Sequence, residues 1–236
     1  SQAIPTIRWP TPVFLIPADP TGGLMARRLP DQDNCRSGLL QVSESFNGDI
    51  MLTQDNKPFS IDTPLGKDVL LLARFKGQEG ISEMFRFDVD LFSEIQSIEF
   101  EEIIGQNVTI SVFLAQGDIR YINGLIASFS QEYGAEEPQE EQQLYRYSAT
   151  IVPWTWLLTR TKDSRIFQNM SVPKIVEKVF SEKDFTDFKL DLTGKYEDRE
   201  YTVQYNETDF NFISRLLEEE GIFYFFNHED SKHTLV

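Results

Sequence analysis

The sequence contains one cysteine, two histidines and no long apolar run, and each shortage removes a class of protein. With Cys35 alone, the chain can form neither an intrachain disulfide framework nor a cysteine-based zinc site. No stretch approaches the roughly 18 apolar residues that a membrane-spanning helix needs. Basic residues number 22 against 38 acidic ones, and the net charge of −16 opposes binding to a phosphate backbone. We therefore expect no membrane span and no nucleic-acid partner.

Motifs of common catalytic chemistry are missing as well. No glycine-rich phosphate loop occurs, and no serine lies in the glycine pattern of a nucleophile elbow. His228 and His233 lie beside Glu229 and Asp230, which are residue types that could bind a metal or transfer protons. Their five-residue spacing, on a strand and its turn, does not direct both rings to one point. We interpret them as solvated residues of a hairpin turn and expect no catalytic residue, cofactor or metal.

Residues 1–56 differ from the rest in composition and in hydrophobic pattern, and we interpret them as a proline-rich N-terminal extension. Six of the 11 prolines fall within the first 50 residues, which show no sustained period and predict little regular structure. Prolines at 10, 12 and 17 interrupt the apolar opening stretch, which makes it a poor signal peptide.

Strand patterns dominate residues 57–160, which we expect to form a first barrel-like β domain. Apolar and polar residues alternate with period two in FRFDVDLFS (85–93), NVTISVFL (107–114) and LYRYSATIVP (144–153). The segment IRYINGLIASFSQEY (119–133) predicts a pair of strands with Gly124 as a bulge or kink, preceded by a turn at 116–118. The acidic segment 132–143 predicts an exposed loop. Short strands at such intervals favour a sheet that curls into a barrel.

Residues 161–236 mix helix and strand patterns. Ser171 can cap a helix with Pro173 in its first turn and an apolar face of Val172, Ile175, Val176 and Val179. A second helix has Asn206 or Thr208 as its cap and ends at Gly221, with Phe210, Ile213, Leu216 and Leu217 on its buried side. The intervening FKLDLTGKYEDREYTVQY (188–205) predicts strand, turn and strand. The fold class is β-rich α+β: barrel-like antiparallel sheet with a smaller mixed insert.

The second helix ends with Glu218, Glu219 and Glu220, where the negative end of the helix dipole disfavours acidic residues by roughly 0.3–1 kcal/mol each. A paired-carboxylate hydrolase site is one interpretation, but consecutive helical residues point about 100° apart and cannot all face one cleft. Arg215, one turn earlier, can reach Glu218 or Glu219.

Three long blocks carry a family resemblance: PLGKDVLLLARFKGQEGISEMFRFDVDLFS (64–93), DSRIFQNMSVPKIVEKVF (163–180) and REYTVQYNETDFNFISRLLEEEGIFYFFNHED (199–230). In this order they resemble the N-terminal region of VgrG, the spike protein of bacterial type VI secretion. The resemblance covers about residues 57–236. It implies a structural hub like that of contractile phage baseplates, in which three subunits close a ring.

The resemblance also implies the partners of that ring. These are two further copies of the chain, a hexameric tube protein of the Hcp type, baseplate components, and a tip protein and effectors bound through later parts of the family's chain. Such proteins reside in the bacterial cytoplasm until the apparatus delivers them outside or into a target cell. The structural or interface candidates are Arg165, Gln204, Glu207, Asp209, Arg215, Glu218, Glu219, Glu220 and Gly221.

Two alternatives stay open from the sequence. The chain could be the hub of a contractile phage tail or a phage-derived injection particle, or a hydrolase that uses its acidic cluster. For the glutamates we expect that arginines such as Arg165, Arg199 or Arg215, or groups of an adjacent subunit, meet them in a buried or interfacial network that outweighs the dipole cost.

Overall fold

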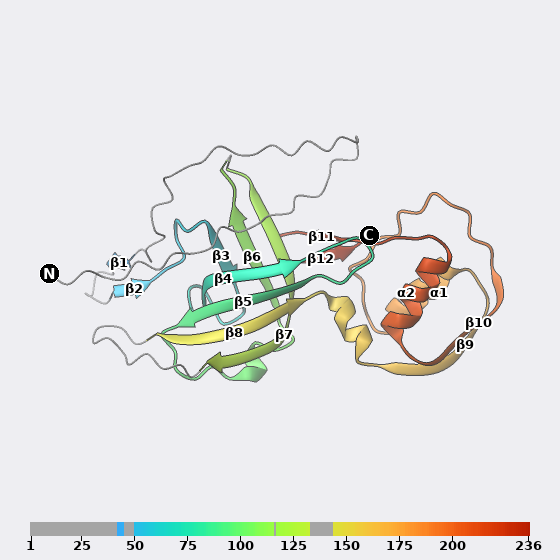
Figure 1. Cartoon of the computed structure of the whole chain (residues 1–236), viewed down its shortest axis with the longest axis horizontal. Coiled ribbons are helices and arrows are strands. Elements are labelled where there is room, and N and C mark those ends of the chain that lie inside the picture. Colours follow the sequence, from blue (N-terminus) through green and yellow to red (C-terminus); the bar gives the residue numbers. More distant parts are fainter. Residues whose placement is uncertain (1–41, 45–49, 116, 133–143) are drawn as a thin grey trace. The chain divides into compact units, whose positions relative to one another are not determined.

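The computed structural model describes residues 42–44, 50–115, 117–132 and 144–236 (Figure 1). Most of the proline-rich extension and most of the acidic loop expected at 132–143 lie outside the described residues. In the described part of the expected extension, β1 (Val42–Glu44) and β2 (Ile50–Leu52) pair as a short antiparallel ribbon.

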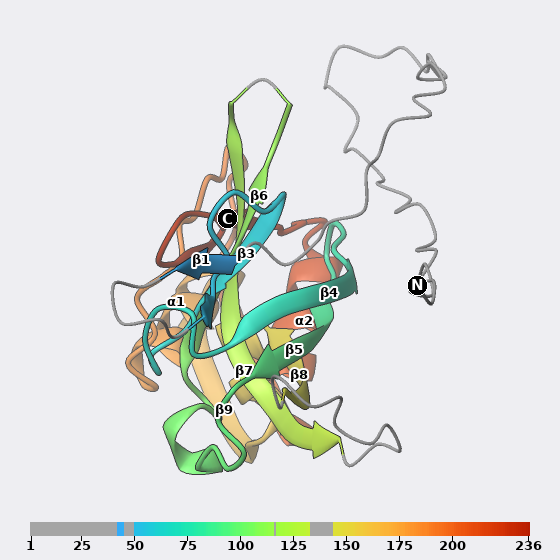
Figure 2. The ribbon, with the colours of Figure 1, turned by 90° about the vertical axis from the view of Figure 1, so that its left-hand side faces the viewer.

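A six-stranded antiparallel sheet forms the larger part of the described fold. Its order along the sheet is β3-β6-β7-β8-β5-β4, and it curls into a half-barrel (Figure 2). The strands are β3 (Phe59–Asp62), β4 (Leu71–Gln78), β5 (Arg86–Ser93), β6 (Asn107–Phe113), β7 (Ile119–Glu132) and β8 (Tyr145–Val152). A short 3-10 helix, η1 (Phe100–Glu102), lies between β5 and β6.

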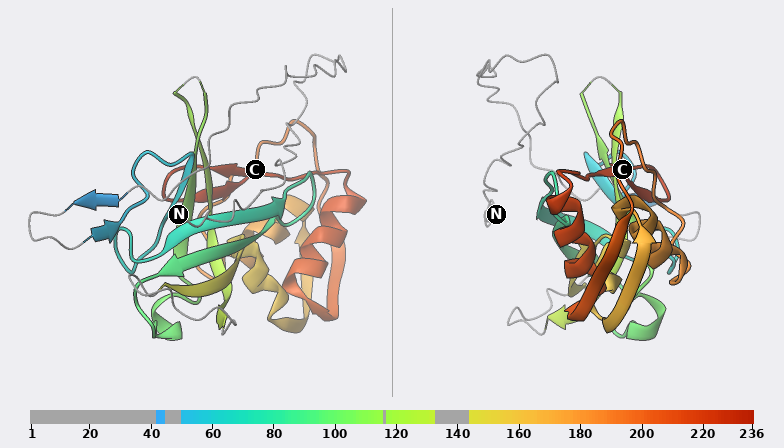
Figure 3. Two further views of the ribbon diagram at one scale, coloured as in Figure 1. Left: turned by 60° about the vertical axis from the view of Figure 1, so that its left-hand side comes forward. Right: turned by 90° about the vertical axis from the view of Figure 1, so that its right-hand side faces the viewer.

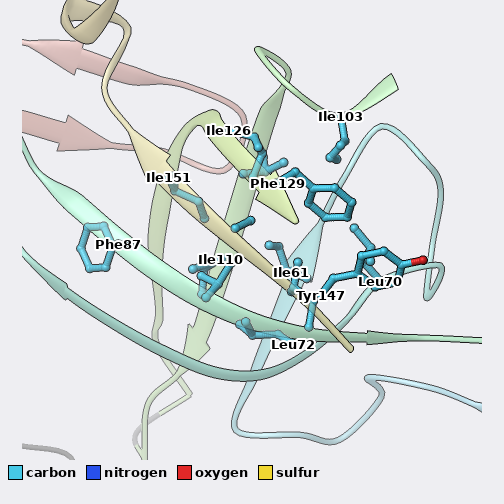
Figure 4. Close-up of a cluster of buried hydrophobic side chains, with 14 of the residues drawn as sticks. Ile61, Leu70, Leu72, Phe87, Ile103, Ile110, Ile126, Phe129, Tyr147 and Ile151 are labelled. Carbon is cyan, nitrogen blue, oxygen red and sulfur yellow. The ribbon is translucent and has the colours of Figure 1, made fainter. Parts of the chain in front are cut away.

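The predicted alternation places one face of this sheet in a hydrophobic core. In β5, Phe87, Val89 and Leu91 are buried while Arg86 and Asp88 are exposed, as the period of two requires. Figure 4 shows apolar side chains from several strands converging inside the curl, including Ile110, Ile126 and Ile151. Leu114 departs from the prediction: it follows the end of β6 and is exposed.

One long strand, β7, replaces the pair of strands predicted at 119–133. Its first half pairs with β6, from Ile119 to Leu125, and its second half pairs with β8, from Leu125 to Glu132. Because the two halves of β7 pair with different strands and not with each other, no turn is needed between them. The prediction of a bulge at Gly124 is also wrong, because the irregularity lies between Ile126 and Ser128.

Gly124 has a different reason to be glycine. A Cβ atom at this position would lie 2.6 Å from Cγ2 of Ile151 and 2.8 Å from the carbonyl oxygen of Val152. The close approach of β8 therefore excludes a side chain.

The rest of the chain forms a smaller mixed part, which we call the helical lobe. A 3-10 helix, η2 (Trp154–Thr159), leads into an antiparallel ribbon of two strands that lies beside two helices (Figure 3). The elements are β9 (Lys162–Met170), α1 (Val172–Ser181), β10 (Arg199–Thr208) and α2 (Asp209–Glu219). A second hydrophobic cluster joins both helices to the inner side of the ribbon through Phe167, Val176 and Phe212. A terminal hairpin of β11 (Phe226–His228) and β12 (His233–Leu235) follows.

Both predicted helices are confirmed. Ser171 is at the cap position of α1 as predicted, but its side chain forms no capping hydrogen bond; the four predicted apolar residues of α1 are all buried. Thr208 is the cap of α2, and its hydroxyl oxygen accepts a hydrogen bond from the Asn211 amide at 3.1 Å. On α2, Phe210 is only partly buried, whereas Phe212, which was not predicted to be in the core, is fully buried. The first fully buried apolar residue of the helix is therefore two positions later than predicted.

The strand predicted after Phe188 does not form, apart from a bridge between Phe188 and Leu235. Alternate side chains at 188, 190 and 192 are partly buried, so the period of two is present. No neighbouring strand in the described residues supplies the remaining hydrogen bonds. The β-rich α+β class is nevertheless confirmed, and no described helix is long and apolar enough to cross a membrane.

Candidate functional site

The two ends of α2 carry two polar networks that contain seven of the nine predicted site residues, all except Glu218 and Gly221. The first network centres on Asp209, the first residue of α2, where the positive end of the helix dipole favours a carboxylate. The Asp209 side chain is 1% exposed. Because a buried charge is costly unless it is paired, its partners decide whether the site is stable.

Four side chains donate hydrogen bonds to Asp209. Oδ2 accepts from Thr161 Oγ1 at 2.6 Å and lies 2.9 Å from Lys183 Nζ, while Oδ1 accepts from Gln204 Nε2 at 2.9 Å and Arg165 Nη2 at 3.0 Å. Burial by itself would raise the pKa of Asp209, but the bonds from Gln204, Thr161 and Lys183 outweigh it and lower the pKa below its usual value. The carboxylate is thus held ionised.

Arg165 and Gln204 come from facing strands of the ribbon, where they are register partners. Arg165 Nε donates to Gln204 Oε1 at 2.8 Å, and Arg165 Nη1 lies 2.5 Å from Glu182 Oε2 beyond the end of α1. The expectation that Arg165 meets the glutamates 218–220 is therefore wrong in this chain: it binds Asp209 and Glu182.

The second network lies at the other end of α2 and centres on Glu219. Arg199 Nη1 lies 2.6 Å from Glu219 Oε2 and Arg199 Nη2 lies 2.5 Å from Glu220 Oε1. Arg215 Nη1 lies 3.1 Å from Glu219 Oε1, and its Nη2 lies 2.7 Å from Glu207 Oε1. Hydrogen bonds from Arg199, and then from Arg215, lower the pKa of Glu219 despite partial burial.

These contacts account for two of the three glutamates. Arginines bind Glu219 and Glu220, as expected, but within this chain the network is not buried, since the Glu219 side chain is 41% exposed. Glu218 is exposed and makes no ion pair within the described part of the chain. Gly221, with φ of +69°, ends the helix as predicted. The Gly221 amide donates to the Glu218 carbonyl and the Ile222 amide to the Leu217 carbonyl, which is the Schellman arrangement.

Together the two networks fasten α2 to the β9–β10 ribbon at both helix ends. The ribbon contributes Arg165, Arg199 and Gln204, and the helix contributes Asp209, Arg215 and Glu219. A glycosidase acid needs a carboxyl group with a raised pKa. The lowered pKa of Glu219 is opposite to what that acid requires, so Glu219 does not fit the role of the acid.

The histidines are not the solvated turn residues that the sequence predicted. They are register partners in the terminal hairpin, and His233 is 3% exposed. His233 Nε2 accepts from the Trp154 amide at 2.8 Å, so Nδ1 carries the proton that it donates to Asn123 Oδ1 at 2.7 Å. His228 Nδ1 lies 3.1 Å from the Asn123 backbone nitrogen and oxygen. Both rings thus dock the hairpin on β7. Burial lowers the pKa of His228, and burial, followed by the nearby His228, lowers that of His233 to about 3.

Sequence reasoning missed three partners of the first network, namely Thr161, Glu182 and Lys183. The sequence feature that could have indicated this network is Asp209 itself. It is an acidic residue directly after the helix cap Thr208 and next to apolar positions of the same helix. Its partners come from three separate segments, which no local pattern connects. Among the described residues, no group of three or more histidine, cysteine, aspartate or glutamate side chains is placed to hold a metal ion.

Comparisons with known proteins place the chain in a family. Residues 78–236 match the family described as phage tail baseplate hub (GPD). The chain is 46% identical over 176 residues to type VI secretion system spike protein VgrG1a of Pseudomonas aeruginosa, across 75% of this chain and 26% of that protein. It is 32% identical over 181 residues to spike protein VgrG3 of Vibrio cholerae, across 73% of this chain and 17% of that protein.

A solved structure shows the same fold. The c3393 protein of E. coli is described as a component of the type VI secretion system with structural similarity to T4 bacteriophage tail proteins gp27 and gp5. It aligns with a TM-score of 0.59 and 29% identity over 77% of this chain and 46% of that one. The chain spans about a quarter of the length of these Pseudomonas relatives. It belongs to the phage tail baseplate hub family, and within that family it is similar to VgrG-type spike proteins of type VI secretion.

Proposed function

We propose that this chain is the N-terminal hub portion of a type VI secretion spike, and that the full-length protein works as a homotrimer. The observation that carries the proposal is the family match over residues 78–236, together with 46% identity to a type VI spike protein. The ring of three would dock on a hexameric tube protein of the Hcp type and on baseplate components. Later parts of the full-length chain would carry the needle, the tip protein and effectors.

The proposed role is mechanical rather than enzymatic. A hub has to keep its surfaces in place under load, and both ends of α2 are fixed to the ribbon by charged hydrogen bonds. We propose that Arg165, Gln204, Glu207, Asp209, Arg215, Glu219, Glu220 and Gly221 maintain the shape of the helical lobe. Glu218, exposed and without an ion pair in the described part, is proposed as an interface residue.

We further propose that the hub divides into an N-terminal extension of residues 1–56, a sheet portion of residues 57–160 and a mixed portion of residues 161–236. The two separate hydrophobic clusters support a boundary near the end of the sheet, since one lies within the curl and the other joins η2, the helices and the ribbon. In the proposed cycle, the protein resides in the bacterial cytoplasm and leaves when the apparatus fires.

The hub of a phage tail or phage-derived particle is the second candidate, favoured by the family description. The identity to spike proteins of two secretion systems favours the first candidate. Mass photometry of the full-length protein, alone and with the tube protein of its own system, tests the proposal. We expect a trimer that binds the tube protein, whereas a monomer that does not bind it would contradict the proposal.

A further inference from the structure

The outer side of the β9–β10 ribbon carries a strip without charge. It consists of three cross-strand pairs, which we call the outer ribbon face: Tyr201 with Gln168, Val203 with Ile166, and Tyr205 with Ser164. One residue in four of this chain is charged, yet none of these six is. Their neighbours in sequence, such as Phe167, Thr202 and Gln204, are buried on the inner side against the helices.

Large side chains of this face are exposed. Tyr205 is 79% exposed, Ile166 55% and Tyr201 54%. Figure 1 shows α1 and α2 on one side of the ribbon, and no described element covers the other side. Depletion of charge together with enrichment of tyrosine is the composition of an interface centre rather than of a free surface.

The charge of the chain indicates which occupant this face suits. A basic partner would gain most by binding where carboxylates are exposed, and an uncharged strip offers it no such attraction. Two copies of a chain with net charge −16 repel each other over most approaches. The outer ribbon face is a surface where that repulsion is weakest, because it brings no carboxylate into the contact.

Six residues are too few for a complete interface, since a stable one uses roughly 20–30 residues on each side. The face therefore suits the centre of a larger contact in a ring. In a closed ring of three, each copy presents two different surfaces, so the face meets another part of its neighbour rather than the same face.

We propose that the outer ribbon face is a contact between copies of this chain in the assembled hub. This inference rests on the proposed trimer and adds the surface that forms it. Because Tyr205 is largely exposed and its ring contributes little to the core, its replacement leaves the fold of the subunit intact.

The first test places a photo-crosslinking phenylalanine analogue at Tyr205 of the full-length protein, with the same analogue at Lys195, whose side chain is 88% exposed, as the control. We expect bands of linked copies from position 205 and far fewer from position 195, with mass spectrometry identifying both linked peptides as this protein. A trimer without copy-to-copy links from position 205 would overturn the inference.

The second test compares Tyr205→Asp, Tyr205→Lys and Tyr205→Asn in the same protein. We expect Tyr205→Asp to raise the dissociation constant of the trimer by at least about tenfold, a typical loss for a central interface residue. Tyr205→Lys should weaken the trimer less, because the neighbouring copy has a net negative charge. Tyr205→Asn should weaken it least. Equal assembly of all variants, or a larger loss for lysine than for aspartate, would overturn the inference.

The outcome for the wild-type protein separates this inference from the proposed function. If the full-length wild-type protein neither trimerises nor binds the tube protein, the proposed function itself is wrong. A wild-type trimer that binds the tube protein, with unaffected Tyr205 variants, would remove only the assignment of this face.

Discussion

Arg165 Nη2 lies 3.0 Å from Asp209 Oδ1, and the side chain of this aspartate is buried, with 1% of its surface exposed. The pair joins the ribbon to the first residue of α2. Removing one partner of such a buried pair lowers the stability of the fold strongly, because the remaining charge is left buried without a partner.

Replacing Asp209 should destabilise the chain. We expect Asp209→Asn to lower the free energy of unfolding by about 3 kcal/mol, since Arg165 and Lys183 lose the carboxylate that they share. Urea denaturation measures the change. Asp187→Asn, at an exposed position, is the matched control and should stay within about 0.5 kcal/mol of wild type. Equal stability of the two variants would contradict the role given to Asp209.

The lowered pKa of Asp209 predicts an acid dependence. A carboxyl group whose pKa is depressed by folding stabilises the protein above its unfolded pKa of about 3.9, and this stability is lost as the pH falls below that value. Wild type should therefore lose more stability than Asp209→Asn between pH 5 and the acid limit of folding. Parallel losses in the two proteins would show that other groups control acid unfolding.

Adjacent glutamates at the end of α2 should respond in opposite directions. Glu219→Gln removes the contacts with Arg199 and Arg215, and because the side chain is partly exposed we expect a loss of about 0.5–1 kcal/mol. Glu218→Gln removes an unpaired charge from the negative end of the dipole and should gain about 0.3 kcal/mol. Thermal and urea unfolding compare the variants. A gain for Glu219→Gln would show that its two ion pairs contribute nothing.

The buried histidine His233 predicts a second pH dependence, which begins at a higher pH than that of Asp209 and overlaps it below about pH 5. The folded pKa of His233 is lowered to about 3, so protonation favours the unfolded chain as the pH falls below the unfolded pKa of about 6.5. The free energy of unfolding should decrease by up to about 1.4 kcal/mol per pH unit for this group between pH 6 and pH 4. In His233→Gln, whose amide can still donate and accept, the decrease should be smaller by that amount. An unchanged slope would mean that His233 is not the group responsible.

Gly124 should not tolerate a side chain. We expect Gly124→Ala to cost about 1–3 kcal/mol, because the new Cβ would meet Ile151 and the backbone of Val152. Gly80→Ala is the control: its nearest neighbour is the flexible end of Glu83, and it should change stability little. Equal effects would indicate that β8 can move away from β7.

Local patterns were enough to predict much of the fold. The alternation around Phe87 and Val89, the cap at Thr208 and the stop at Gly221 each depend on residues close in sequence, and each is confirmed. The strand pair at 119–133 was wrong because the sequence does not show that β7 changes partners halfway along its length.

The candidate site was predictable only in part. The arginines near Glu219 and Glu220 were expected from their charge, and Arg199 and Arg215 do bind them. Arg165 was expected there as well, but its place in the register opposite Gln204 directs it to Asp209. The burial of His233 likewise depends on Asn123 and Trp154, more than 70 residues away in the chain.

Electron microscopy of the full-length protein bound to its tube protein shows directly whether this chain is a hub subunit. We expect a threefold ring in which the six-stranded sheets surround the axis and the ring caps one end of a hexameric tube. A protein that stays monomeric beside free tube rings, under conditions in which the tube protein assembles, would contradict the assignment of this chain as a hub subunit.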